Sequence, residues 1–248
     1  MLINIAAYHF VAVDDPEKLA VDLRAAATAL CLLGTMLVAG EGLNLFLVGE
    51  VAAIDTFVDD LRRDPRFAGI RIKRSESQAQ PFARLKVKVK PEIISFRREE
   101  ASPLRARAPA VAPADLARWI AHGKDDAGRR LVLFDTRNRE EVAHGTFAAA
   151  LTLPIDRFTQ LPEALAPHRA ALADATVVSF CTGGIRCEKA ALWMRSEGMD
   201  NVLQLEGGIL GYFEAVGGAG YVGNCFVFDE RIALDASLRP LTEQAANG

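Results

Sequence analysis

The sequence predicts an α/β protein of two domains: an N-terminal α+β domain and a second domain built around a central parallel sheet. Three observations support this prediction. Strand-like and helix-like hydrophobic spacings alternate over roughly the first 90 residues, a proline- and charge-rich segment without periodicity follows, and buried strand-like runs separated by helices then begin. A chain of 248 residues, half of them hydrophobic, is long enough for two modest domains.

The N-terminal domain is expected over residues 1–90, in the order strand, helix, strand, strand, helix, strand. Asp14 or Asp15 can cap the first helix, and Pro16 suits its first turn. The sequence Gly-Glu-Gly at 40–42 predicts a turn between the second and third strands. This order is the ferredoxin-like split β-α-β pattern. The expected strands are 3–13, 35–39, 43–48 and 70–74, and the expected helices are 16–33 and 52–62.

A further strand is expected at 85–89, where apolar residues alternate with lysines and give one apolar and one basic face. A linker is then expected over 91–112, because periodicity fails and 97–113 holds three prolines and several charges.

The second domain is expected over 113–218, followed by an irregular tail over 219–248 with one strand-like run at 225–229. Strands separated by helices imply a parallel sheet that is covered on both faces. The expected strands are 131–134, 176–180 and 202–205, and the expected helical segments are 114–121, 139–144, 161–172 and 188–196.

Composition narrows the class of protein. The first 15 residues lack the charged start of a signal peptide, and the longest apolar patch, 29–40, is too short to span a bilayer. The four cysteines and four histidines have no metal-ligand spacing. We therefore expect a cytoplasmic protein with reduced thiols, no metal, no evident cofactor and no membrane association.

Positive charge is concentrated in one stretch of an otherwise acidic chain. Between Arg62 and Arg107 there are 14 Lys and Arg against 5 Asp and Glu, although the formal net charge is −3. Such a basic block favours an anionic partner, and the alternative is an ordinary solvated face with a charged linker.

The strongest chemical signal is the sequence Cys-Thr-Gly-Gly-Ile-Arg-Cys at 181–187, between a buried strand and a helix. Backbone N–H groups and the positive end of a helix dipole favour a thiolate at Cys181. Gly183 and Gly184 allow several N–H groups to point at one atom. Four residues separate Cys181 from Arg186, one fewer than cysteine phosphatases need, so the loop suits a smaller group such as one added sulfur. The alternative is an inert buried cysteine.

The motifs together resemble known families. The loop, Phe-Asp-Thr-Arg at 134–137 and Leu-Glu-Gly-Gly at 205–208 resemble a rhodanese domain. Over residues 1 to about 235, the chain is similar to the oxygen-dependent tRNA uridine hydroxylases, on segments 41–44, 81–90, 180–190 and 223–229.

The resemblance implies a ferredoxin-like domain joined to a rhodanese-like domain. It also implies an oxidoreductase that hydroxylates C5 of the wobble uridine in tRNA, with molecular oxygen as co-substrate and no protein partner. Cys181 would be catalytic, supported by Thr182, Gly183, Gly184, Ile185, Arg186 and Cys187. Two alternatives stay open: a sulfurtransferase that uses thiosulfate or a persulfide, and a non-catalytic RNA-binding or persulfide-carrier module.

Several cysteines and charged residues near the loop have two interpretations. Arg186 either stabilises an anion in the loop or forms a structural salt bridge. Cys187 either forms a disulfide with Cys181 or is a small residue at a helix start. Asp135 and Arg137 are expected to connect loops, and Cys31 to lie in the core on the first helix. Cys225 stays ambiguous.

A basic set near the fifth strand is expected to bind RNA phosphates, which gives affinity but no sequence choice. Selection of a uridine needs an aromatic surface for base stacking, for which Phe82, Phe96 and Tyr212 are candidates, with core packing as the alternative. The RNA-binding candidates are Arg74, Arg84, Lys86, Lys88 and Lys90.

Overall fold

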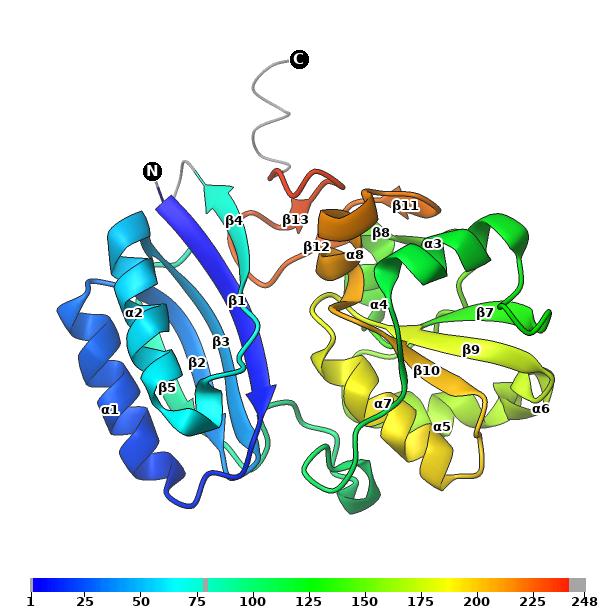
Figure 1. Ribbon diagram of the computed structural model, residues 1–248, viewed down its shortest axis with the longest axis horizontal. Helices are drawn as coiled ribbons and strands as arrows, with labels where there is room; N and C mark the ends of the chain where they lie inside the picture. Colours follow the sequence, from blue (N-terminus) through cyan, green and yellow to red (C-terminus); the bar gives the residue numbers. More distant parts are fainter. Residues whose placement is uncertain (1, 78–79, 241–248) are drawn as a thin grey trace, which may run out of the picture. The chain divides into compact units, whose positions relative to one another are not determined.

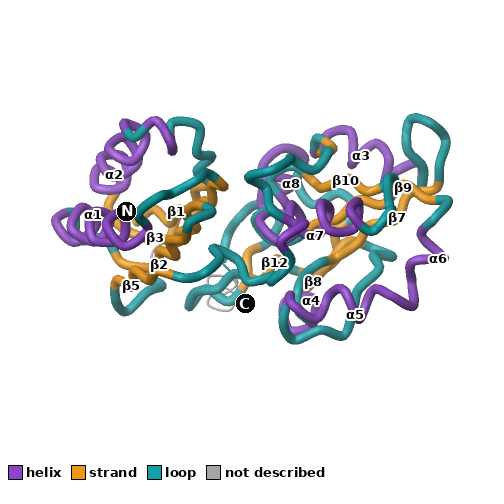
Figure 2. The backbone as a smooth tube through the Cα atoms, turned by 90° about the horizontal axis from the view of Figure 1, so that it is seen from below, coloured by secondary structure: helices purple, strands orange, loops and turns teal. Residues whose placement is uncertain are grey.

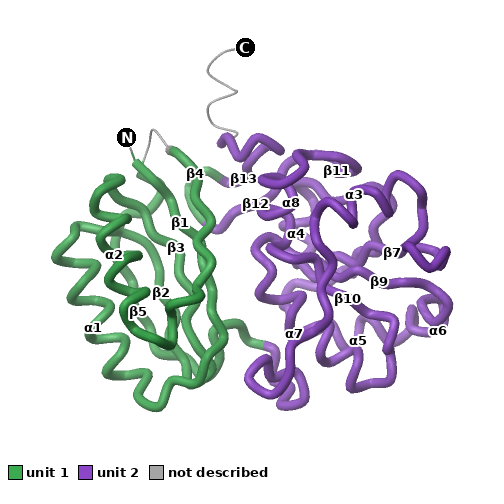
Figure 3. The backbone as a smooth tube through the Cα atoms, viewed as in Figure 1, with its two compact units in different colours: residues 1–95, 229–231 green, residues 96–228, 232–248 purple. Residues whose placement is uncertain are grey.

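A computed structural model describes residues 2–77 and 80–240, which form two compact units (Figure 3). Unit 1 comprises residues up to Ser95 together with Asp229–Arg231, and unit 2 comprises Phe96–Phe228 and the residues from Ile232 onward. No helix among the described residues is long and apolar enough to cross a membrane.

Unit 1 is a five-stranded sheet in the order β4-β1-β3-β2-β5. Only β2 and β5 pair in parallel, and the first four strands have the ferredoxin-like arrangement. Both helices lie on one side of the sheet (Figure 2), where their apolar residues share one core with inward-facing strand residues. The elements are β1 Leu2–Phe10, α1 Pro16–Ala29, β2 Leu33–Ala39, β3 Gly42–Glu50, α2 Val51–Arg63, the 3-10 turn η1 Pro65–Phe67, β4 Lys73–Ser77 and β5 Leu85–Val89.

The first helix begins where the sequence indicates and ends earlier. Asp15 caps it, because its side chain accepts a hydrogen bond from Lys18 N at 2.8 Å. The helix stops at Ala29 instead of residue 33, since Cys31 adopts a left-handed conformation with φ 55°. The expectation that Cys31 lies in the core is therefore wrong: it follows the helix and is exposed.

The last strand of the ferredoxin-like pattern is shifted from the expected 70–74 to Lys73–Ser77. Ile70 is a buried core residue after the turn η1, and its N–H donates to Phe67 O at 3.0 Å. Pairing with β1 starts only at Lys73, opposite Ala6. Ile70 thus packs into the core without belonging to β4.

Unit 2 contains a four-stranded parallel sheet in the order β6-β10-β9-β7 (Figure 1). This confirms the predicted α/β class, although β6 lies inside the segment expected to be a linker. The main elements are β6 Ala110–Val111, α3 Pro113–His122, β7 Arg130–Asp135, α4 Arg139–His144, β8 Gly145–Phe147, α5 Leu161–Leu165, α6 Arg169–Leu172, β9 Ala175–Phe180, α7 Ile185–Ser196, β10 Val202–Leu205, α8 Gly208–Val216, β11 Tyr221–Gly223, β12 Cys225–Phe226 and β13 Ala233–Leu234. Short 3-10 turns are η2 Glu99–Ala101, η3 Phe158–Gln160 and η4 Ala166–His168.

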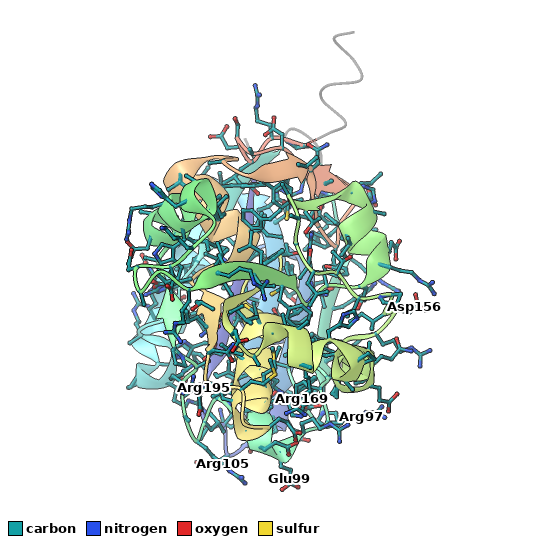
Figure 4. All side chains as sticks on the ribbon, turned by 90° about the vertical axis from the view of Figure 1, so that its right-hand side faces the viewer. Arg97, Glu99, Arg105, Asp156, Arg169 and Arg195 are labelled. Atoms are coloured by element: carbon teal, nitrogen blue, oxygen red, sulfur yellow. The ribbon has the colours of Figure 1, made fainter. Side chains whose placement is uncertain are left out.

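Helices cover both faces of this sheet. Val178 and Phe180 of β9 pack into a core with residues of α3 and α8. Ser179 points the other way, and its hydroxyl donates to Cys187 O of α7 at 3.4 Å. Every residue of β9 is buried. Charged side chains such as Arg97, Glu99 and Asp156 instead point outward at the periphery of unit 2 (Figure 4).

Over its described residues, 219–240, the tail is more ordered than the sequence indicates, and 241–248 lie outside the described residues. Strand β11 pairs with β8, and the expected strand 225–229 is only the two-residue β12, which pairs with β13. Asp229–Arg231 belong to unit 1, where Arg231 donates to Ser75 Oγ at 2.7 Å.

The start of α8 holds the loop that follows β9. Ile209 N donates to Cys181 O at 2.9 Å, and Leu210 N donates to Thr182 O at 3.1 Å. Gly208 has φ +63°, and a Cβ there would lie 2.5 Å from Cys181 O and 2.7 Å from Gly184 N. Only glycine therefore allows this close approach.

We predict that Gly208→Ala destabilises unit 2 by at least about 3 kcal/mol, because the new methyl group meets backbone atoms that cannot move independently. Gly123→Ala is the matched control, since Gly123 has φ +69° but nothing within 4 Å of its Cβ position. The Gly123→Ala variant should therefore lose only about 1–2 kcal/mol of stability, the cost of placing a non-glycine residue in a left-handed conformation. Urea unfolding measures both variants, and equal losses would contradict the predicted clash.

Candidate functional site

Cys181 lies directly after the carboxyl end of β9. In the sheet order, β9 lies between β10 and β7. Ligands of open α/β sheets bind at such carboxyl ends. The Cys181 side chain is fully buried. The predicted loop is therefore placed where the fold can present a reactive group.

The loop between Cys181 and the helix is shorter than expected. Helix α7 begins at Ile185 instead of residue 188, so Arg186 and Cys187 belong to its first turn. Gly184 is its N-cap residue with φ 107°, a left-handed conformation that favours glycine. The N–H of Gly184 donates to Cys181 Sγ at 3.1 Å. The positive end of the helix dipole thus lies next to this sulfur.

Four groups act on the charge of Cys181. Burial alone would raise the pKa of its thiol, but the Cys187 thiol, the positive charge of Arg186 and the backbone N–H groups of both residues hold that pKa well below its usual range. The loop is thus built to stabilise a thiolate, which is the nucleophilic form of cysteine.

Arg186 forms a buried ion pair whose partner the sequence did not indicate. Its guanidinium donates to both carboxylate oxygens of Glu141 in α4, with Nη1–Oε2 at 2.5 Å and Nη2–Oε1 at 2.6 Å. The side chains of Arg186 and Glu141 are 7% and 2% exposed. The structural salt bridge expected as one interpretation of Arg186 is present, while stabilisation of an anion in the loop stays a prediction, which the effect of its positive charge on the pKa of Cys181 supports.

Glu141 connects several parts of the site. Its Oε2 accepts a hydrogen bond from Asn138 N at 3.2 Å, and its Oε1 is 3.5 Å from Thr182 Oγ1. The Asn-x-x-Glu spacing at the start of α4 is a helix-capping signal. That signal could have marked Glu141 as structurally important, but nothing in it indicates Arg186 as a partner.

Asp135 and Arg137 form a second buried ion pair, which confirms their expected structural role. Arg137 Nη2 lies 2.6 Å from Asp135 Oδ2 and also donates to Gly145 O at 2.6 Å. Thr146 Oγ1 donates to Asp135 Oδ2 at 2.7 Å. The pair thereby joins the end of β7 to the start of β8.

The other two thiols of unit 2, Cys187 and Cys225, differ in how they are placed relative to Cys181. Cys187 Sγ lies 4.0 Å from Cys181 Sγ and donates to Gly184 O at 3.0 Å. Burial raises the pKa of Cys225 to about 12, which makes that thiol unreactive at neutral pH. Of the two, only Cys187 is placed to take part in chemistry at Cys181.

The basic candidates divide between the two edges of the unit 1 sheet. Arg74 lies on edge strand β4 and pairs with Asp55 at 2.7 Å. Arg84, Lys86, Lys88 and Lys90 lie in or beside the opposite edge strand, β5, are exposed, and form no ion pair with any described residue. The structure therefore separates Arg74 from a continuous row of unneutralised charges.

The wider basic block is also divided. Residues up to Ser95 belong to unit 1, whereas Arg97 to Arg107 belong to unit 2. In unit 1, Arg63 and Arg66 pair with neighbouring aspartates. The block in the sequence therefore does not form one surface within either unit.

Two of the three aromatic candidates for base stacking are core residues. Phe96 is 1% exposed and stacks on Phe158 with ring centroids 4.4 Å apart. Tyr212 is fully buried, and its hydroxyl donates to Ala219 O at 2.8 Å. Phe82 is partly exposed and lies two residues before Arg84. Of the three, only Phe82 stays available to a base.

A parallel α/β sheet with a cysteine loop at its carboxyl edge defines unit 2 as a rhodanese-like domain. Family models match accordingly: a UPF0176 acylphosphatase-like domain over residues 2–93 and a rhodanese-like domain over residues 112–215. A tRNA uridine(34) hydroxylase of Xanthomonas campestris pv. campestris (strain 8004) is 68% identical over 246 residues, covering 99% of this chain and 97% of that protein. The tRNA uridine(34) hydroxylase of Xylella fastidiosa (strain M23) is 61% identical over 241 residues, covering 97% and 94%. The chain belongs to the tRNA uridine(34) hydroxylase family, which confirms the predicted resemblance.

Proposed function

We propose that this chain hydroxylates C5 of uridine 34, the wobble uridine of tRNA, with Cys181 as the catalytic residue and molecular oxygen as co-substrate. The proposal is supported by identity over nearly the whole chain to proteins named tRNA uridine(34) hydroxylase. Within the site, the observation that carries it is the placement of Cys181 directly after a buried strand, where its Sγ accepts the N–H of Gly184 at 3.1 Å at the start of α7.

Sulfur transfer is the second candidate function. The groups that stabilise a thiolate at Cys181 would also stabilise the terminal sulfur of a persulfide, because both are anions. Strong Cys181-dependent turnover of thiosulfate and cyanide, without tRNA hydroxylation, would favour that function.

The test of hydroxylation is nucleoside mass spectrometry of tRNA from cells that lack this protein and any parallel uridine 34 hydroxylase. We expect wild type and Cys31→Ala to restore 5-hydroxyuridine derivatives and Cys181→Ala to restore none, because Cys181 is the proposed catalytic residue and Cys31 lies outside the loop. Cys31 is an exposed thiol of unit 1 and therefore a matched control. Full restoration by Cys181→Ala would contradict the proposed catalytic role.

For the tRNA itself, we propose the basic row at β5 as the phosphate-binding surface. Arg84, Lys86, Lys88 and Lys90 are exposed and unneutralised, and Phe82 beside them offers a ring for stacking. Arg74, which is paired with Asp55 at the other edge, is not needed for this surface. A tRNA substrate also leads us to infer a cytoplasmic location.

Changing Lys86, Lys88 and Lys90 together to Ala is expected to weaken tRNA binding and to flatten its dependence on salt. The slope of log K against log salt is negative, and each lost phosphate contact reduces its magnitude by about 0.7–0.9. Binding of the full chain to tRNA, measured from low to physiological salt, tests this. Arg74→Ala is the control and should leave the slope unchanged. An unchanged slope in the triple variant would place the RNA elsewhere.

A further inference from the structure

Two cysteine sulfurs lie in contact inside the loop of unit 2. Cys181 Sγ and Cys187 Sγ are 4.0 Å apart, and both side chains are fully buried. One follows the last residue of β9 and the other lies in the first turn of α7, with Gly183 and Gly184 between them. Both thiols thus come from one short segment of the chain, the strand end and the helix start that the loop connects.

The two sulfurs are in contact but are not bonded. A disulfide has an S–S bond of about 2.05 Å, so closure requires about 2 Å of relative movement by the sulfurs. Cys187 Sγ is held by Gly184 O at 3.0 Å and lies 3.9 Å from Gln204 Oε1. Both are weak contacts of a thiol, so they hold the Cys187 side chain less firmly than ordinary hydrogen bonds would.

The two thiols are also chemically unequal. The loop stabilises the thiolate form of Cys181, whose Sγ accepts the N–H of Gly184 at 3.1 Å, whereas Cys187 Sγ donates to Gly184 O at 3.0 Å. A thiolate next to a thiol is the usual state of a redox-active cysteine pair. Buried Cys225, in contrast, stays protonated at neutral pH.

We propose that Cys181 and Cys187 form a dithiol–disulfide redox centre that supplies two electrons during hydroxylation. This inference rests on the proposed function. Hydroxylation of C5 by molecular oxygen removes two electrons from the uridine, whereas full reduction of oxygen takes up four. Two further electrons must therefore come from a reductant, and the adjacent dithiol holds that number.

The reaction balances with these groups alone. Uridine, one O₂ and two thiols give 5-hydroxyuridine, one water and one disulfide. The C5–H, O–O and S–H bonds break, and the C5–O, S–S and three O–H bonds form. Where Cys181 starts as a thiolate, solvent returns the proton that its thiol had released. One oxygen atom enters the uridine and the other leaves as water, which takes up the remaining two hydrogens. A low-molecular-weight thiol or a protein dithiol must then reduce the disulfide before the next turnover.

The test is a single turnover of fully reduced protein with tRNA and oxygen, without added thiol. Alkylation of free thiols followed by peptide mass spectrometry shows which cysteines are linked. We expect one Cys181–Cys187 disulfide for each 5-hydroxyuridine formed, and no disulfide when oxygen is absent. Hydroxylation that leaves both thiols free would overturn the redox centre. Cys225→Ser should behave as wild type, because that thiol lies outside the pair.

A second arm separates this inference from the proposed function. One equivalent of hydrogen peroxide, without tRNA, converts two thiols to a disulfide and two waters. Wild type should form the Cys181–Cys187 link and Cys187→Ser should not. If wild type hydroxylates no tRNA yet forms this link, the proposed function fails and the reactive pair stands. If peroxide leaves both thiols unlinked, the pair is not redox-active.

Discussion

The site depends on keeping a negative charge on a buried sulfur. Burial disfavours a thiolate, so each neighbour of Cys181 must offset that cost. The N–H of Gly184, the positive end of α7 and the charge of Arg186 all act in this direction. The first turn of α8 meanwhile binds the carbonyl groups of Cys181 and Thr182. The loop carbonyls are thereby held in hydrogen bonds while an N–H group points at the sulfur.

Two buried ion pairs keep this loop in place. An unpaired arginine next to Cys181 would be costly in a low-dielectric interior, and Glu141 removes that cost through two charge-assisted hydrogen bonds. Asp135 and Arg137 hold the neighbouring connection between β7 and β8. The second thiol then lies where the first turn of α7 puts it. Chemistry at Cys181 therefore depends on residues from α4, α7 and α8.

Local sequence signals were sufficient to predict much of the fold and the position of the cysteine loop at 181–187. Asp15 and Pro16 marked a helix start, and the spacing of Cys181, Gly184 and Arg186 marked a thiolate site. Features set by tertiary contact could not be predicted in this way. Cys31 ends α1 without a glycine, and the position of β4 is fixed by pairing with β1. The sequence likewise cannot show that Arg74 has Asp55 as a partner.

The most direct test of this account is a thiolate titration by ultraviolet absorbance, taking wild type minus Cys181→Ser in the folded state and again in urea. Unfolded cysteine titrates near a pKa of about 8.5. We predict a folded midpoint well below that in urea, so the thiolate adds stability that is complete above the unfolded pKa of Cys181 and is lost as pH falls through its folded pKa. A folded midpoint at or above the one in urea would contradict it.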